Sequence, residues 1–142
     1  MSTYKVKATK TTTGMQVSAG TRGFEITFDE PSSTNTGMNP VEILLTSFGA
    51  CQAITATELA RQRHFNLQSF WVEIEGDLGH EDVANGDNRY KFTEIRYQPH
   101  LRSNESDEDI KNFLADVAKK CPVENTLAFG TKFVPDGFVK EN

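Results

Sequence analysis

The sequence predicts an α+β fold, because its strand patterns are grouped apart from its helical patterns. Three short segments of alternating apolar and polar residues precede one long apolar segment of helical character. Two longer alternating segments, two helical segments and a last alternating stretch follow. We therefore expect the order βββ-α-ββ-αα-β, with antiparallel sheets around a long central helix, in a single domain that spans residues 1–142.

The first three expected strands lie ahead of the long apolar segment. Residues 4–8 alternate apolar side chains with lysines, which is typical of a half-buried strand. We expect Gly14 to turn the chain into a second strand over residues 15–19. The third strand, residues 24–28, has the clearest alternation. Residues 30–38 are rich in Pro, Ser, Thr, Asn and Gly, and therefore predict a loop.

A long helix is expected to begin after Asn39. Asn39 is a favoured N-cap, Pro40 suits the first helical position, and Glu42 completes the pattern of a capping box. The helix is expected to continue to about His64. Residues 43–60 are apolar around much of the helix, so we expect it to be central and covered on several sides.

A hairpin is expected after this helix. Alternation over residues 70–75 predicts a strand that ends near Gly76, and residues 90–101 predict its partner. Between them, the sequence Asn85-Gly86-Asp87-Asn88 is a strong turn signal.

Two helices and a closing strand are expected in the last part of the chain. The first helix begins near Ser106, where Asp107–Asp109 supply the negative charge that a helix N-terminus favours. Pro122 disfavours helical backbone at Cys121, so this helix ends there and a short one follows through Leu127. After Gly130, the closing strand is expected over two stretches, residues 132–134 and 138–139.

Charge and composition argue against several classes of partner. The formal net charge is −5 and no segment concentrates Lys or Arg, so neither nucleic acid nor an anionic membrane is an expected partner. We find no window near the roughly 20 apolar residues of a membrane span, and the N-terminal residues lack the apolar region of a signal peptide. The protein is therefore expected to be cytoplasmic, where a pair of thiols is more often catalytic or redox-sensing than a static disulfide.

The chemistry of the chain depends on its two cysteines. Cys51 lies within the long helix, and it is either a small core residue or a reactive thiol. Cys121 lies between two expected helices, where backbone N–H groups and the helix dipole would lower a thiol pKa. The two thiols face the core from two helices, so they form either a redox pair or two packing residues.

Three motifs resemble one known family. The segment NPVEILLTSFGACQA, residues 39–53, resembles the helix of the OsmC/Ohr family, the osmotically induced and organic-hydroperoxide-resistance proteins. CPVENTL, residues 121–127, resembles the second cysteine motif of that family, and Asp29–Pro31 resembles the lead-in to its helix. The resemblance covers nearly the whole chain, and the order of elements is similar as well.

The resemblance implies a fold, an assembly and a reaction. It implies a single OsmC-like domain in an intertwined homodimer with two active sites at the interface. It implies the reduction of organic hydroperoxides by Cys51 as the peroxidatic cysteine, with Cys121 as the resolving cysteine that forms an intramolecular disulfide. An external dithiol, lipoyl or similar, is then the expected reductant, with no cofactor and no metal.

Two more residues are candidates by resemblance, as activators of the thiolate. Arg22 is the one arginine before the long helix, and its alternative role is an exposed charge at a strand end. Glu42 is the candidate orienting carboxylate, although the hydroperoxide-resistance branch has its Glu one position earlier, at Val41. On an ideal helix Glu42 and Cys51 leave opposite sides, and the capping box already explains Glu42.

Other side chains give weaker signals. The three histidines, at positions 64, 80 and 100, have no spacing that suits a metal. Phe48, Phe70 and Phe129 would line an apolar peroxide site, or equally form a core. Two alternative functions stay open: a non-enzymatic protein that binds a small ligand in an OsmC-type pocket, and a slow thiol redox sensor.

Overall fold

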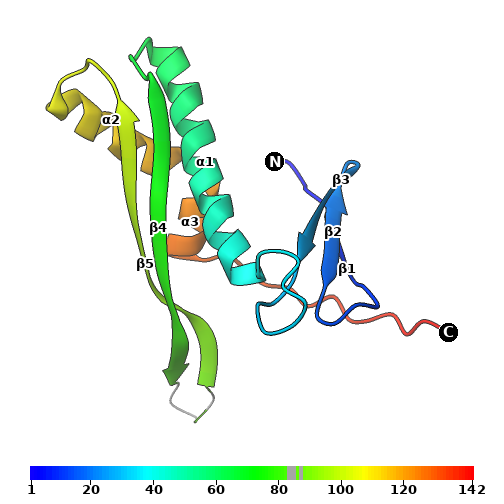
Figure 1. The fold of residues 1–142 in the computed structure, drawn as a ribbon. Coiled ribbons are helices and arrows are strands. Elements are labelled where there is room, and N and C mark those ends of the chain that lie inside the picture. Colours follow the sequence, from blue (N-terminus) through cyan, green and yellow to red (C-terminus); the bar gives the residue numbers. More distant parts are fainter. Residues whose placement is uncertain (83–85, 87) are drawn as a thin grey trace. The chain divides into compact units, whose positions relative to one another are not determined.

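The computed structural model describes residues 1–82, 86 and 88–142. Its elements, in chain order, are β1 (Lys7–Lys10), β2 (Val17–Thr21), β3 (Phe24–Phe28), α1 (Pro40–Arg63), β4 (Ser69–Asp82), β5 (Asn88–Arg102), α2 (Asp107–Lys120) and α3 (Pro122–Phe129) (Figure 1). The predicted α+β class is confirmed, and so is the order of elements as far as the second of the paired helices.

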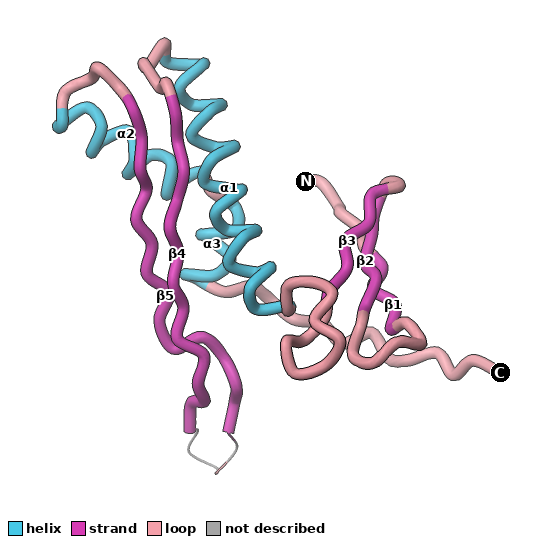
Figure 2. Tube along the Cα trace, in the orientation of Figure 1, coloured by secondary structure: helices cyan, strands magenta, loops and turns pink. Residues whose placement is uncertain are grey.

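The described chain divides into two compact units. One unit comprises Met1–Ser47 and Ile74–Arg96, and the other comprises Phe48–Glu73 and Tyr97–Asn142. The long helix and the two long strands, which Figure 2 distinguishes by colour, each contribute residues to both units. The boundary between the two units therefore passes through these three elements and not through a linker.

The first unit contains a three-stranded antiparallel sheet in the order β1-β2-β3. Thr21 pairs with Phe24, so a two-residue turn joins β2 to β3. The third strand has the predicted bounds, whereas the first begins only at Lys7. The prediction that residues 4–8 form a half-buried strand is wrong, because Tyr4 is 89% exposed and Val6 is 77% exposed and both precede the strand.

A buried carboxylate organises the loop between β3 and α1. Asp29 is 2% exposed, and its oxygens accept hydrogen bonds from the Thr34 and Thr36 hydroxyls and from the backbone N–H groups of Glu30 and Thr36. Its own N–H donates to the Met38 carbonyl at 3.1 Å, which closes the loop just before α1. These contacts, with Thr34 first, hold the pKa of Asp29 well below its usual range.

One glycine in this loop is required by space. A Cβ at Gly37 would lie 2.3 Å from the Thr27 carbonyl oxygen, so no side chain fits where the loop crosses β3. The loop predicted over residues 30–38 is thus fixed by a buried acid and by close backbone contact.

The hairpin of β4 and β5 is longer than predicted. The first strand continues past Gly76 to Asp82, and its partner begins at Asn88. A Cβ at Gly76 would lie 2.6 Å from the Phe92 ring, so this glycine gives the ring room and does not end the strand. The turn signal over residues 85–88 falls largely outside the described residues.

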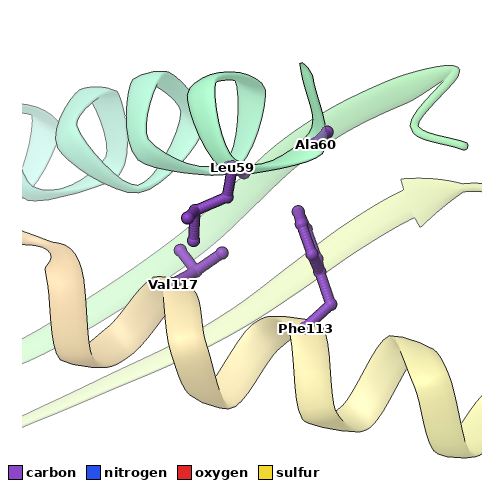
Figure 3. Packing of buried hydrophobic residues seen from close by; sticks show 5 residues of the cluster. Leu59, Ala60, Phe113 and Val117 are labelled. Carbon is purple, nitrogen blue, oxygen red and sulfur yellow. The ribbon is translucent and has the colours of Figure 1, made fainter. Parts of the chain in front are cut away.

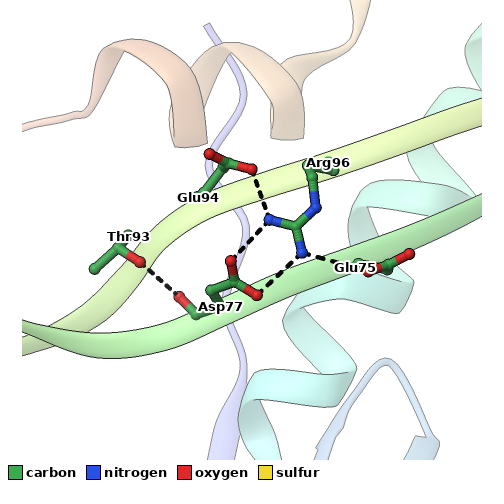
Figure 4. Close-up of polar contacts among 5 residues, drawn as sticks. All are labelled: Glu75, Asp77, Thr93, Glu94 and Arg96. Carbon is green, nitrogen blue, oxygen red and sulfur yellow. Dashed lines mark hydrogen bonds and ion pairs between the residues drawn. The ribbon is translucent and has the colours of Figure 1, made fainter.

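An exposed ion-pair network crosses the hairpin around Arg96 (Figure 4). Its guanidinium contacts Asp77 at 2.8 Å, Glu94 at 2.6 Å and Glu75 at 3.3 Å. The hydrogen bond with Asp77 is the main cause that raises the pKa of Arg96, and it lowers the pKa of Asp77 in turn. The network joins the two strands by side chains in addition to the backbone ladder.

The long helix begins as the sequence predicts. The Asn39 N–H donates to the Glu42 carboxylate at 2.9 Å, and the Glu42 N–H donates to the Asn39 side chain at 2.9 Å, which is a complete capping box. Contrary to the sequence expectation, α1 is long and apolar enough to cross a membrane by length and composition alone. A core helix meets the same test, and 33% of that window is buried within this chain.

The core of the second unit lies between α1 and α2 (Figure 3). Ala56, Leu59 and Ala60 of α1 pack against Phe113 and Val117 of α2, and all five are buried. Burying a side chain the size of Phe or Val stabilises a fold by about 1.5–3 kcal/mol. This cluster therefore fixes α2, and with it the residues that follow α2, against the C-terminal part of α1.

The closing strand expected over residues 132–134 and 138–139 is absent from the described chain. A strand needs a neighbour for its backbone N–H and C=O groups, and no described strand pairs with this segment. Its apolar side chains are exposed, with Phe133 at 90% and Phe138 at 91%.

The Asp29 network makes stability depend on pH in a defined direction. Because the pKa of Asp29 is depressed in the folded state, its contribution is present above about pH 4, the unfolded value, and is lost as pH falls through the folded value. We expect Asp29→Asn to lower the melting temperature at pH 7, and the difference from the unmodified protein to shrink below about pH 4.

Thermal melts of both proteins between pH 7 and acid would measure this difference. Glu25→Gln, at an exposed position on β3, is the matched control for loss of one charge. A difference that stays constant across this range would contradict an ionised Asp29 as the support of the loop.

Candidate functional site

The two cysteines come together in the second unit. Cys51 lies in the middle of α1 and is half-buried, whereas Cys121 follows α2 and is fully buried. Both are free thiols, and the Cys51 side chain is near enough to Cys121 to raise the pKa of that thiol. The sequence left open whether the two thiols approach at all, and the structure brings them together.

Cys121 occupies the junction that the sequence predicted for it. Its backbone is extended, with φ of −81° and ψ of 108°, and it is at once the C-cap of α2 and the N-cap of α3. Pro122 accounts for this conformation, because it disfavours helical backbone at the preceding residue and suits the first position of the next helix. The Cys121 Sγ accepts a hydrogen bond from the Glu124 N–H at 3.5 Å, in the manner of an N-cap side chain.

The electrostatics of Cys121 differ from the sequence expectation. Burial raises the pKa of its thiol and the neighbouring Cys51 raises it further, while the Glu124 N–H and the Gln52 side chain lower it. The helix N-terminus does lower this pKa through the Glu124 N–H, as predicted, but the net direction of the shift is upward. The loss of hydration in a fully buried site outweighs one cap hydrogen bond and the dipole of a short helix.

Three residues that the sequence analysis did not select complete the surroundings of the thiols. The Gln52 Nε2 donates to one oxygen of the Glu124 carboxylate at 2.7 Å, and the Tyr97 hydroxyl donates to the other at 3.0 Å. Gln52 is only 2% exposed, which is unusual for a polar side chain without a structural or chemical role. The available signals were a glutamine beside Cys51 and a glutamate three residues after Cys121, the spacing of a capping box.

Tyr97 is anchored on its apolar side by Phe48. The two rings meet edge to face, with their centroids 4.9 Å apart, and Phe48 is 2% exposed. Burial raises the pKa of Tyr97 to about 12, and the carboxylate of Glu124 and the Cys121 thiol act in the same direction. The hydroxyl is therefore a hydrogen-bond donor throughout the neutral range. Of the three phenylalanines that the sequence offered for an apolar site, Phe48 therefore lies in the surroundings of the thiols.

The other two aromatic candidates lie elsewhere. Phe70 packs against the buried cluster between α1 and α2, so it has the core role that was the alternative to lining a peroxide site. Phe129, the last residue of α3, is 85% exposed within this chain.

Arg22 and Glu42 both belong to the first unit. Arg22 lies in the turn between β2 and β3 with a φ of 54°, in the left-handed region, and its guanidinium lies 5.2 Å from the centre of the Phe24 ring. The carboxylate of Glu42 takes part in the capping box of α1, which confirms its structural role. Activation of the Cys51 thiolate by either residue stays a prediction.

The histidines and the acidic residues give no metal site among the described residues, where no group of three or more candidate ligands occurs. His100 stacks on Trp71 with ring centroids 5.0 Å apart, and its Nε2 lies 3.5 Å from the Glu73 carboxylate. Asp107–Asp109 occupy the first turn of α2, with Ser106 as the N-cap, which confirms their predicted role.

A groove of about 380 Å³ lies in the second unit, away from the two sulfurs. It is lined by Ala53, Thr57, Ala60, Arg61, Phe65, Leu67, Gln68, Ser69 and Phe70. Neither cysteine contributes to its wall, so it does not serve as the thiol site.

Comparison with known proteins identifies the family. Residues 33–135 match the model of the OsmC-like protein family, which spans α1, the hairpin and both cysteines. The chain belongs to the OsmC-like family. This membership confirms the resemblance drawn from residues 39–53 and 121–127, whereas Asp29–Pro31 precede the matched residues.

Relatives within the OsmC-like family carry a functional name. The chain is 29% identical over 112 residues to a hydroperoxide reductase of Mycoplasma genitalium, covering 78% of this chain and 77% of the relative. It is 30% identical over 105 residues to a hydroperoxide reductase of Mycoplasma pneumoniae, covering 73% and 72%. At family level these relatives support a peroxidase-type role.

A solved structure has the same fold. The crystal structure of an OsmC-like protein from Mycoplasma pneumoniae matches with a TM-score of 0.79 and 26% identity, over 89% of this chain and 88% of that one. The OsmC-like fold is therefore shared along most of the chain.

The unequal exposure of the two thiols predicts the order in which they react. Cys51 is half-buried and Cys121 is fully buried with a raised pKa, so we expect iodoacetamide to alkylate Cys51 first at pH 7. Alkylation of Cys121 should require higher pH or partial unfolding. Peptide mass spectrometry over a time course would measure both rates, and faster labelling of Cys121 in the folded protein would contradict the assignment.

Proposed function

We propose that the protein is a thiol-dependent peroxidase that reduces organic hydroperoxides, with Cys51 as the peroxidatic cysteine and Cys121 as the resolving cysteine. The observation that carries the proposal is the meeting of an accessible thiol and a buried thiol in one compact unit. Relatives that are named hydroperoxide reductase support the class of reaction.

In the first step the Cys51 thiolate attacks the hydroperoxide. A bond forms between its sulfur and the terminal oxygen, the O–O bond breaks, and the alkoxide leaves and takes up a proton to become an alcohol. Cys51 then carries a sulfenic acid. Half-burial leaves this sulfur accessible to substrate, and Arg22 and Glu42 are the proposed activators of the thiolate.

In the second step Cys121 resolves the sulfenic acid. Its sulfur attacks the Cys51 sulfur, the S–O bond breaks, and the hydroxide leaves as water with the proton that the Cys121 thiol gives up. The raised pKa of Cys121 supports this order, because the thiol keeps its proton until the resolving step. An external dithiol, lipoyl or similar, then reduces the disulfide by two thiol exchanges, so the cycle needs no further cofactor.

The proposal includes a homodimer. Support comes from apolar side chains that the described chain leaves exposed: Phe24 at 66% and Ile26 at 51% on β3, Ile54 at 62% and Leu44 at 38% on α1. A helix as apolar as α1, of whose apolar window only 33% is buried within its own chain, is typical of an element that another chain covers. The sequence predicted that α1 is covered on several sides, but one chain alone covers only part of this helix.

Sedimentation equilibrium tests the assembly. We expect twice the mass of the chain across micromolar concentrations, and Ile54→Glu should shift the protein toward monomer, because it places a charge in an apolar interface. A monomer at every concentration in the unmodified protein would remove the homodimer from the proposal.

Kinetics with two peroxides test the reaction. We expect cumene hydroperoxide to be consumed faster than hydrogen peroxide, with dihydrolipoamide as the reductant. Cys51→Ser should lower turnover by roughly a thousandfold or more, because it removes the nucleophile. Cys121→Ser should still consume one equivalent of peroxide but fail to turn over with the dithiol.

The alternatives give different results in the same assay. A slow redox sensor would form the disulfide but turn over poorly with every dithiol. A ligand-binding protein would leave both thiols unmodified in the presence of peroxide, and this result would overturn the peroxidase.

A further inference from the structure

The carboxylate of Glu124 joins elements that carry the two sulfurs. It lies in the first turn of α3, where its backbone N–H donates to the Cys121 Sγ at 3.5 Å. Both carboxylate oxygens are occupied, one by Gln52 of α1 and the other by Tyr97 of β5. Glu124 thus contacts Cys121 through its backbone, and α1 and β5 through its side chain.

The hydrogen bond between Gln52 and Glu124 joins two residues that are each close in sequence to one of the cysteines. Gln52 directly follows Cys51 in α1, and Glu124 lies one helical turn from Cys121. Their hydrogen bond of 2.7 Å therefore spans the same gap as the two thiols, from α1 to the start of α3. Gln52 is buried and also lowers the pKa of the Cys121 thiol, so its amide bonds the carboxylate and acts on the thiol.

The contact with Tyr97 fixes the direction of the carboxylate. The Tyr97 ring packs edge to face against the buried Phe48, and this contact supports the position of its hydroxyl. Two donors from two separate elements hold a planar carboxylate more firmly than either donor alone. The first turn of α3 is therefore tied to α1 and to β5 at one point.

We infer that Glu124 is a positioning residue for the resolving step: held by Gln52 and Tyr97, it keeps the start of α3 in place so that the Cys121 sulfur is aligned with the Cys51 sulfur. The inference rests on the proposed function and deepens it. Glu124 does not act on the peroxide, so it affects the capture of oxidised Cys51 and leaves the first attack unchanged.

A disulfide reagent tests this inference without any peroxide. The Cys51 thiolate attacks 5,5′-dithiobis(2-nitrobenzoate), which releases one thionitrobenzoate and leaves the other bound to Cys51 in a mixed disulfide. The Cys121 thiolate then attacks the Cys51 sulfur, which forms the protein disulfide and releases the second thionitrobenzoate. The two releases report separately on access to Cys51 and on the alignment of Cys121.

Glu124→Gln is the decisive variant. It keeps the size of the side chain but removes its charge and replaces one acceptor oxygen by an NH₂ donor, so both charge-assisted hydrogen bonds are lost and only weaker neutral contacts with Gln52 and Tyr97 can replace them. We expect the second release to slow by about tenfold, the order of effect for a lost hydrogen bond to a charged group, while the first release changes less than about twofold.

Two further variants separate positioning from general stability. Tyr97→Phe removes only the hydroxyl donor and should slow the second release in the same direction. Glu58→Gln, at an exposed position on α1, removes a charge away from the thiols and should leave both releases unchanged. A melting temperature for each reduced variant shows that it is folded under the assay conditions.

The outcomes distinguish the inference from the proposed function. An unchanged or faster second release in folded Glu124→Gln overturns the positioning role, and so does an equal slowing of both releases. If the unmodified protein completes both releases but does not react with organic hydroperoxides, the peroxidase fails while the alignment of the thiols stands. With peroxide, Glu124→Gln should accumulate sulfinic acid on Cys51 at lower doses, because slow resolution leaves the sulfenic acid open to a second oxidation.

Discussion

The packing of α2 against the C-terminal part of α1 is the contact on which the site depends. Phe113 and Val117 pack against Ala56, Leu59 and Ala60, and all five side chains are buried. Because α2 ends directly at Cys121, fixing α2 also fixes where the second sulfur lies. The first sulfur is one to two helical turns before this cluster on α1, so a single apolar contact brings both thiols together.

The local elements were predictable wherever neighbouring residues decide the structure. Asn39 and Glu42 specify the start of α1 by mutual hydrogen bonds, and Pro122 specifies the break at Cys121. The resemblance of the cysteine motifs then gave the family. Two predictions from local pattern were wrong because tertiary contacts decide these structures. The strand does not end at Gly76, where the Phe92 ring needs the space, and the segment after Gly130 has no strand partner within the described chain.

The parts of the site that the sequence did not reveal all depend on contacts between distant residues. Gln52, Tyr97 and Glu124 come from three separate elements, and none of them stands out as a catalytic residue by type or spacing. The direction of the Cys121 pKa shift was also out of reach, because it reflects a balance between burial and hydrogen bonding. A helix N-terminus alone favoured the thiolate, and the surrounding protein reversed that preference.

The position of Cys121 at the end of one helix and the start of another has a consequence for how the sequence can vary. A helix N-cap favours a small oxygen-bearing side chain, and serine would fill this role better than sulfur does. Helix capping alone would thus favour the exchange of one atom, sulfur for oxygen. A cysteine at this junction is a choice that helix capping does not require, which supports the resolving role proposed for Cys121.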